Sequence, residues 1–145
     1  MTTAKWKILV CDPLDEAGAE IFKKEPNIEL VNAPKPGAPE IKTLIKDAVG
    51  VVVRSGTTLT AEWIKEGDQL RIIGRAGVGV DNVDVNAASR RGIVVVNTPG
   101  GNTISAAEQT VALMLSLARN IAPAHQSMCE GRWDRKKYTG VELFE

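Results

Sequence analysis

Three segments of this sequence combine residue types suited to binding a small anion. Arg54 and Ser55 follow a β-branched run, and Arg75 and Gly77 follow a second apolar run. Asn102 comes shortly after a third such run. The planar guanidinium of arginine matches a carboxylate or phosphate, and glycine lets the backbone approach a ligand closely. Each loop alone is more simply explained as a turn, but together the three predict an anion site.

Five apolar segments predict the strands that would position these loops. Their last residues are spaced by about one strand, one short helix and two turns, which is typical of an α/β fold with an open, mostly parallel sheet. In such a sheet, ligands bind beyond the carboxyl ends of the strands. The third and fifth segments are β-branched throughout, which predicts strands covered on both faces. The segments are 7–11, 28–32, 50–53, 70–74 and 93–96.

Helices are predicted between the strands, at 14–24, 40–48, 61–66 and 83–91. Thr60 is a candidate N-cap and Gly92 a candidate C′ residue. A longer helix is predicted from Asn102 to about Asn120, with Ser105 and Glu108 forming a capping box, or with Asn102 or Thr103 as the cap. A last helix is predicted over 123–130.

The 102–120 helix is apolar nearly all round, which is typical of a helix buried on several sides. We therefore expect it to pack against another domain or another subunit.

Composition excludes several classes of protein. The chain has 145 residues, 43% of them apolar and 25% charged, which is typical of a soluble globular domain. Eighteen basic and eighteen acidic residues cancel, and aromatic residues are few, so neither nucleic acid nor a membrane surface is an expected partner. The two cysteines lie far apart, which favours a reducing, cytoplasmic setting.

Other chemistry is less well supported by the residues. No cysteines and histidines have zinc-ligand spacing, so no metal site is expected. The glycines at 74–79 do not meet the G-x-G-x-x-G dinucleotide fingerprint. His125, the single histidine, is better explained by a surface or interface role than as a general base.

Several motifs resemble the D-isomer-specific 2-hydroxyacid dehydrogenases. They are 74–84 (GRAGVGVDNVD), 96–99 (VNTP) and the Asn102 to Glu108 segment, and the resemblance covers essentially the whole chain. The motifs at 53–55 and 131–137 resemble the branch of that family that acts on phosphoglycerate. The resemblance implies a flavodoxin-like, five-stranded open parallel sheet with helices on both faces. Residues 1–98 would be the substrate-binding domain, and 99–145 a helical crossover and dimer-contact segment of a nucleotide-binding half that is absent.

The same resemblance implies an activity and its residues. The complete enzyme would oxidise 3-phosphoglycerate with NAD, the first step of serine biosynthesis, as a homodimer or homotetramer joined through the 102–120 helix. Val78 would lie against the nicotinamide, where relatives often carry threonine, so that a side-chain hydrogen bond is lost. The substrate would be held by Arg54, Ser55, Arg75, Gly77, Asn102 and Arg135.

No catalytic residue is assigned within this chain. The nucleotide fingerprint and the catalytic arginine, glutamate and histidine of the family would lie beyond Glu145, so residues 1–145 alone are expected to be inactive. Two alternatives stay open. One is a different member of the family, such as a glyoxylate or hydroxypyruvate reductase. Arg54 and the basic 132–137 run argue against this alternative, because a phosphorylated substrate needs more cationic contacts. The other is a non-catalytic interaction module on the same fold.

Overall fold

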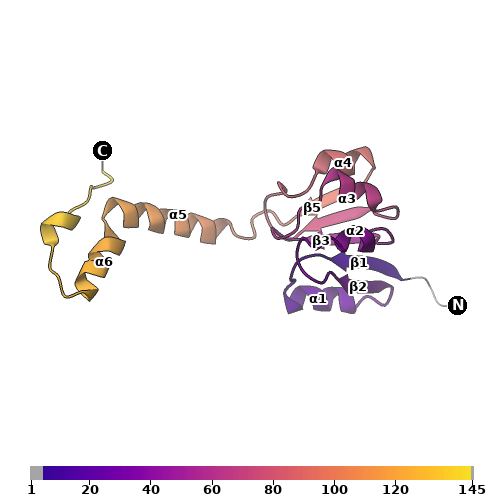
Figure 1. The fold of residues 1–145 in the computed structure, drawn as a ribbon, viewed down its shortest axis with the longest axis horizontal. Coiled ribbons are helices and arrows are strands. Elements are labelled where there is room, and N and C mark those ends of the chain that lie inside the picture. Colours follow the sequence, from indigo (N-terminus) through magenta and orange to yellow (C-terminus); the bar gives the residue numbers. More distant parts are fainter. Residues whose placement is uncertain (1–4, 145) are drawn as a thin grey trace. The chain divides into compact units, whose positions relative to one another are not determined.

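The computed structural model describes residues 5–144 and consists of two units, the first ending at Gly101 and the second beginning at Asn102. The first unit is built around a parallel sheet, and the second is helical (Figure 1). Among the described residues, no helix has both the length and the hydrophobicity needed to cross a bilayer.

Five parallel strands form the sheet of the first unit, in the order β2-β1-β3-β4-β5. The order changes direction at β1, with β2 on one side and β3 to β5 on the other, as in doubly wound α/β folds. All five predicted strands are confirmed to within two residues at each end. Their bounds are β1 (Trp6–Val10), β2 (Ile28–Asn32), β3 (Gly50–Val53), β4 (Ile72–Arg75) and β5 (Val94–Asn97).

Helices follow the first four strands, and local signals explain where they begin and end. Asp15 caps the first helix by accepting from the N–H of Ala17, and Thr60 caps the third by accepting from the N–H of Trp63, as predicted. Gly92 has φ +68°, so it adopts the left-handed conformation that ends the fourth helix. The helices are α1 (Glu16–Lys23), α2 (Ile41–Leu44), α3 (Ala61–Glu66) and α4 (Val85–Arg90).

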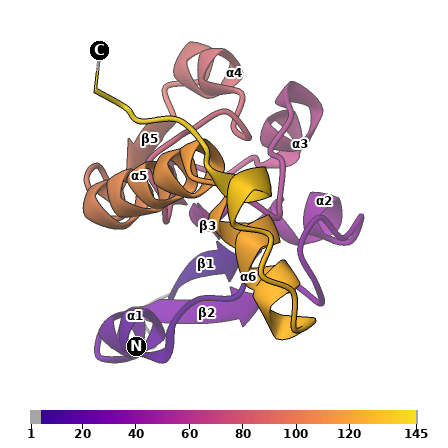
Figure 2. The ribbon, with the colours of Figure 1, turned by 90° about the vertical axis from the view of Figure 1, so that its left-hand side faces the viewer.

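The main hydrophobic core lies on one face of the sheet, under α2, α3 and α4 (Figure 2). Leu9, Val51 and Ile73 stand in one row across β1, β3 and β4, and all three are almost completely buried. Ile41 and Ile64 bring the facing helices into the same cluster. A row of this kind requires alternate residues to point to the same face.

The other face of the sheet is covered only in part. Ile8 and Val10 of β1 are buried there, while Ile72 of β4 and Val94 and Val96 of β5 are 40%, 55% and 44% exposed. The prediction that the fifth strand is covered on both faces is therefore wrong in this structure. The helix on this face, α1, contacts β2, and none of the other three helices of the first unit crosses to it.

The second unit contains α5 (Thr103–Ala118), α6 (Ile121–Cys129) and the 3₁₀ helix η1 (Arg135–Tyr138). The predicted capping box is wrong. Ser105 lies inside the first turn, where its hydroxyl donates to the Asn102 carbonyl at 3.0 Å, and Asn102 occupies the N-cap position without a side-chain capping bond. Asn120, with φ 52°, separates α5 from α6, so α5 ends earlier and α6 begins earlier than predicted.

Large apolar side chains remain exposed along α5. Leu117 is 82% exposed and Ile104 72%, and Val111, Leu113, Met114 and Leu115 are each at least 43% exposed. Such a surface on a helix is typical of a contact with another protein segment.

Candidate functional site

The loops after β3, β4 and β5 meet at the carboxyl edge of the sheet. Arg75, the last residue of β4, is in register with Val53, and Arg54 comes directly after Val53. The N–H of Ala76 donates to the Val53 carbonyl at 2.8 Å, and the N–H of Thr98 donates to the Gly77 carbonyl at 3.0 Å. Of the predicted site residues, this edge therefore carries Arg54, Ser55, Arg75, Gly77 and Val78.

The guanidinium of Arg75 lies directly against the backbone of Gly77. A Cβ atom at residue 77 would overlap Nη1 of Arg75 and would lie 2.6 Å from its Cζ. A side chain at residue 77 would therefore require the flexible end of Arg75 to move away. The side chain of Arg75 is half-buried. Its Nε is buried and has no hydrogen-bond partner among the described residues, so this nitrogen can still donate a hydrogen bond.

Arg54 has different neighbours. Its backbone N–H donates to Oδ2 of Asp12 at 2.6 Å, and its Nη1 donates weakly to the carbonyl of Pro13 at 3.4 Å. The loop after β1 therefore holds Arg54 by both its backbone and its side chain. Arg54 and Ser55 are exposed, so both can contact a ligand.

Asn82 and Thr57 fasten the loop that begins at Arg54. The Nδ2 of Asn82 donates to the carbonyls of Arg54, at 2.5 Å, and of Thr57, at 2.6 Å. The Thr57 hydroxyl accepts from the N–H of Gly37 at 3.0 Å and donates to the Cys11 carbonyl at 3.3 Å. Asp12, Thr57 and Asn82 are the buried polar residues of the first unit.

Sequence reasoning did not single out these three buried polar residues. Asp12 carries a usable signal, because it is an acidic residue placed directly between the end of an apolar strand and a proline. Asn82 lies within the 74–84 motif, but nothing in that motif indicates a role for its side chain.

Val78 presents an apolar side chain at the same edge and is 40% exposed. Its carbonyl accepts a hydrogen bond from Nδ2 of Asn97 at 2.7 Å, which fixes the loop backbone. The side chain is therefore free to meet a flat apolar ligand.

The two remaining predicted site residues lie in the second unit. Asn102 stands at the start of α5, and Arg135 is an exposed residue of η1.

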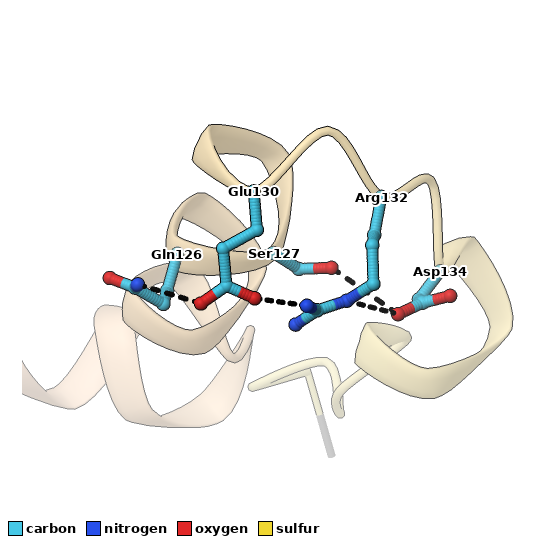
Figure 3. Close-up of polar contacts among 5 residues, drawn as sticks. All are labelled: Gln126, Ser127, Glu130, Arg132 and Asp134. Atoms are coloured by element: carbon cyan, nitrogen blue, oxygen red, sulfur yellow. Dashed lines mark hydrogen bonds and ion pairs between the residues drawn. The ribbon is translucent and has the colours of Figure 1, made fainter.

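The basic segment of the second unit is partly neutralised from within (Figure 3). Arg132 pairs with Glu130 and with Asp134, whose Oδ2 also accepts from the Ser127 hydroxyl at 3.3 Å. The ion pairs remove Arg132 from the set of free cations and tie the end of α6 to the start of η1. Among the described residues, Arg135 of η1 forms no ion pair, and the Lys137 ammonium lies over the Tyr138 ring, 5.5 Å from its centroid.

Two further observations concern other chemistry. Burial, with a smaller effect of the neighbouring Asp12 charge, raises the pKa of the Cys11 thiol to about 12, so this thiol is not a nucleophile at neutral pH. Sγ of Cys129 lies 3.5 Å from Nε2 of His125 on the exposed side of α6. Within residues 5–144, no three side chains of the metal-binding types gather into a possible ion site.

Comparison with known proteins identifies the class of protein. The family model described as "D-isomer specific 2-hydroxyacid dehydrogenase, catalytic domain" matches residues 8–139. The chain belongs to this family, which is a family of oxidoreductases.

Within the family, the similar curated proteins are D-3-phosphoglycerate dehydrogenases. The chain is 48% identical to that of Archaeoglobus fulgidus over 94% of this chain and 26% of the relative. It is 45% identical to that of Synechocystis sp. over 96% of this chain and 25% of the relative. The chain thus spans about a quarter of the length of the curated relatives it matches.

Solved structures of the family share the fold. A cofactor (NAD+)-bound 3-phosphoglycerate dehydrogenase from Entamoeba histolytica is 36% identical, with a TM-score of 0.66 over 80% of this chain and 40% of that one. An NAD-dependent formate dehydrogenase from Staphylococcus aureus in complex with NAD is 28% identical, with a TM-score of 0.81 over 94% of this chain and 46% of that one. Because enzymes with different substrates match the same fold, the substrate has to be argued from the site.

Proposed function

We propose that this chain is the substrate-binding part of an NAD-dependent D-3-phosphoglycerate dehydrogenase. The observation that carries the proposal is the pair of arginines, Arg54 and Arg75, on adjacent strands at the carboxyl edge of the sheet. A substrate that bears both a phosphate and a carboxylate needs two cationic contacts, and arginine suits both groups. The 45–48% identity to D-3-phosphoglycerate dehydrogenases over nearly all of this chain supports the same substrate.

Each predicted residue has a role in this proposal. Arg54 and Ser55 bind one anionic end of 3-phosphoglycerate, and Arg75, seated on Gly77, binds the other. We also assign Asn102 and Arg135 to substrate binding, and residues 99–145 to the nucleotide-binding half of the complete enzyme.

NAD fits the residues present only at its nicotinamide end. The exposed, apolar Val78 offers a surface for a flat ring, and its own loop is held in place by Asn97. The chemistry that NAD would supply is acceptance of the hydride in the oxidation of the substrate. This chain would contribute only the contact at Val78, and we place the acid–base group outside residues 1–145. We therefore expect no NAD-dependent turnover from this chain alone, and measurable oxidation of 3-phosphoglycerate would contradict that assignment.

The substrate assignment is tested by calorimetric titration of the 145-residue chain with 3-phosphoglycerate and with glycerate. The change Arg54→Gln removes one charged hydrogen-bond donor and is expected to weaken 3-phosphoglycerate binding about 10- to 100-fold, with a smaller effect on glycerate. Arg71→Gln, at the opposite end of β4, is the matched control. Equal losses for both ligands would contradict a contact between Arg54 and the phosphate.

We also propose that α5 joins two copies of the protein. The apolar side chains exposed along this helix support that assignment, because a monomer rarely leaves a surface of this kind uncovered. Sedimentation of the chain should show a concentration-dependent dimer or tetramer, and Leu117→Gln should weaken it. A strictly monomeric wild-type chain at all concentrations would refute this role for α5.

A further inference from the structure

The side chain of Asn82 spans the loop that carries Arg54 and Ser55. One amide nitrogen donates to the carbonyls of both Arg54 and Thr57, at 2.5 and 2.6 Å, and these two residues stand at the two ends of the loop. Asn82 lies 28 and 25 positions away from them in the sequence, so this is a contact between separate crossovers of the sheet. Only about a tenth of its surface is exposed.

The backbone of Asn82 is itself held against the end of the same loop. The N–H of Leu59 donates to the Asn82 carbonyl at 2.8 Å, and the N–H of Asp84 donates to the Leu59 carbonyl at 2.9 Å. Leu59 and Val83 form a parallel bridge. These bonds fix where the Asn82 side chain starts, so its short amide has little freedom to point elsewhere.

Asp12 holds the loop from another crossover. Its Oδ2 accepts the backbone N–H of Arg54 at 2.6 Å, across 42 positions of sequence. Asp12 is also buried. The backbone of Arg54 is thus bonded at its N–H by Asp12 and at its carbonyl by Asn82, while its side chain remains exposed for a ligand.

We propose that Asn82 and Asp12 are positioning residues, which hold the loop of residues 54–57 in its binding conformation before any anion arrives. This inference rests on the proposed function, because it assigns the loop to the substrate anion. Neither residue is proposed to touch the ligand. A loop that is ordered in advance does not have to be ordered during binding, and fixing the backbone of one residue changes an equilibrium by about tenfold. The hydrogen bonds from Asn82 and Asp12 to the loop are together called the brace. Loss of the brace should therefore weaken anion binding by about tenfold.

The test uses nuclear magnetic resonance of the 145-residue chain. In the free wild-type protein, the amides of Ser55 and Gly56 should have order parameters near 0.85, which is typical of a rigid backbone. In Asn82→Leu, which keeps the approximate shape without adding charge, they should fall below about 0.6, and the Kd for 3-phosphoglycerate should rise about tenfold. Flexible Ser55 and Gly56 amides in the wild-type protein would overturn the proposal without any variant.

A second pair of variants separates positioning from a general structural role. Asp12→Ala removes the acceptor for the N–H of Arg54 and should mobilise the loop, whereas Asp12→Asn keeps an acceptor oxygen and should restore both loop order and affinity. Asn27→Leu, before β2 at the opposite edge of the sheet, is the control for an asparagine-to-leucine change. Equal loop order and affinity in Asp12→Ala and the wild-type protein would overturn the proposal.

The two proposals fail in different ways. If the wild-type chain does not bind 3-phosphoglycerate, the proposed substrate site is refuted, and with it the purpose assigned to the brace. If the wild-type chain binds and Asn82→Leu binds equally well with an ordered loop, the substrate site stands and the positioning role is refuted.

Discussion

Thr57 offers a sharp test of how the candidate site is built into the fold. Its side chain is fully buried, and its hydroxyl accepts from the N–H of Gly37 at 3.0 Å and donates to the Cys11 carbonyl at 3.3 Å. Thr57→Val replaces the hydroxyl by a methyl group of nearly the same size, so no cavity is created. The change therefore isolates the two hydrogen bonds.

The expected cost follows from what each bond partner can do afterwards. Gly37 is exposed, so its N–H can bond to water instead. The carbonyl of Cys11, a buried residue, has no other hydrogen-bond partner among the described residues. Leaving such a group unsatisfied costs about 1–3 kcal/mol, and burying the new methyl group returns about 0.8 kcal/mol. The difference between these two contributions is about 0.2–2 kcal/mol, so we expect Thr57→Val to lower the free energy of unfolding by at most about 2 kcal/mol.

Urea denaturation measures that cost, and amide hydrogen exchange locates it. The Gly37 amide should exchange faster in Thr57→Val than in the wild-type chain, because its acceptor is gone. Thr57→Ser keeps the hydroxyl and should leave the Gly37 exchange rate unchanged, even though the lost methyl lowers stability. Equal Gly37 exchange in Thr57→Val and the wild-type protein would refute the reasoning, as would a Thr57→Val variant that is more stable than the wild-type protein.

Three other predictions each concern a single side chain. Gly77→Ala should displace the Arg75 guanidinium and weaken 3-phosphoglycerate binding without changing net charge. Unchanged affinity by calorimetry would contradict a binding role for Arg75 in its position against Gly77. Because burial raises the pKa of Cys11 to about 12, a thiol reagent at pH 8 should label one cysteine in the folded chain and two in urea. The Lys7 ammonium, 2.6 Å from Asp47, lowers the pKa of that carboxyl, so the pair stabilises the fold above the usual carboxyl pKa and stops doing so as pH falls through the lowered value. Asp47→Asn should then cost less than about 1 kcal/mol at pH 7, and thermal unfolding should show a smaller cost at acidic pH than at pH 7.

Much of the fold could be predicted because its signals are local. The β-branched runs at 50–53 and 93–96 have a high strand propensity, and Thr60 and Gly92 act within one helical turn. The exposed face of β5 could not be predicted in this way. A run of valines shows that both faces of a strand are apolar, but it does not show which segment, if any, covers each face.

The candidate site was predicted only in its ligand-facing half. Arg54 and Arg75 were found because their side-chain chemistry and their place after a strand are visible in the sequence. Asn82 and Asp12 were missed because their role depends on contacts to backbone groups 28 and 42 positions away. Backbone donors and acceptors are identical in every residue, so the sequence around Arg54 contains no mark of what will bond to it.

The brace links anion binding to the stability of the sheet. Asp12 follows β1, Thr57 follows β3 and Asn82 follows β4, so the loop conformation depends on three crossovers being in place together. A ligand that binds only the folded loop must then stabilise the whole first unit, by about 2.7 kcal/mol at a concentration 100 times its Kd. In Asn82→Leu, part of the binding free energy would go into ordering the loop, so the same ligand concentration would give a smaller rise in unfolding temperature. The ligand-induced shift therefore reports preorganisation independently of the stability that the substitution itself removes.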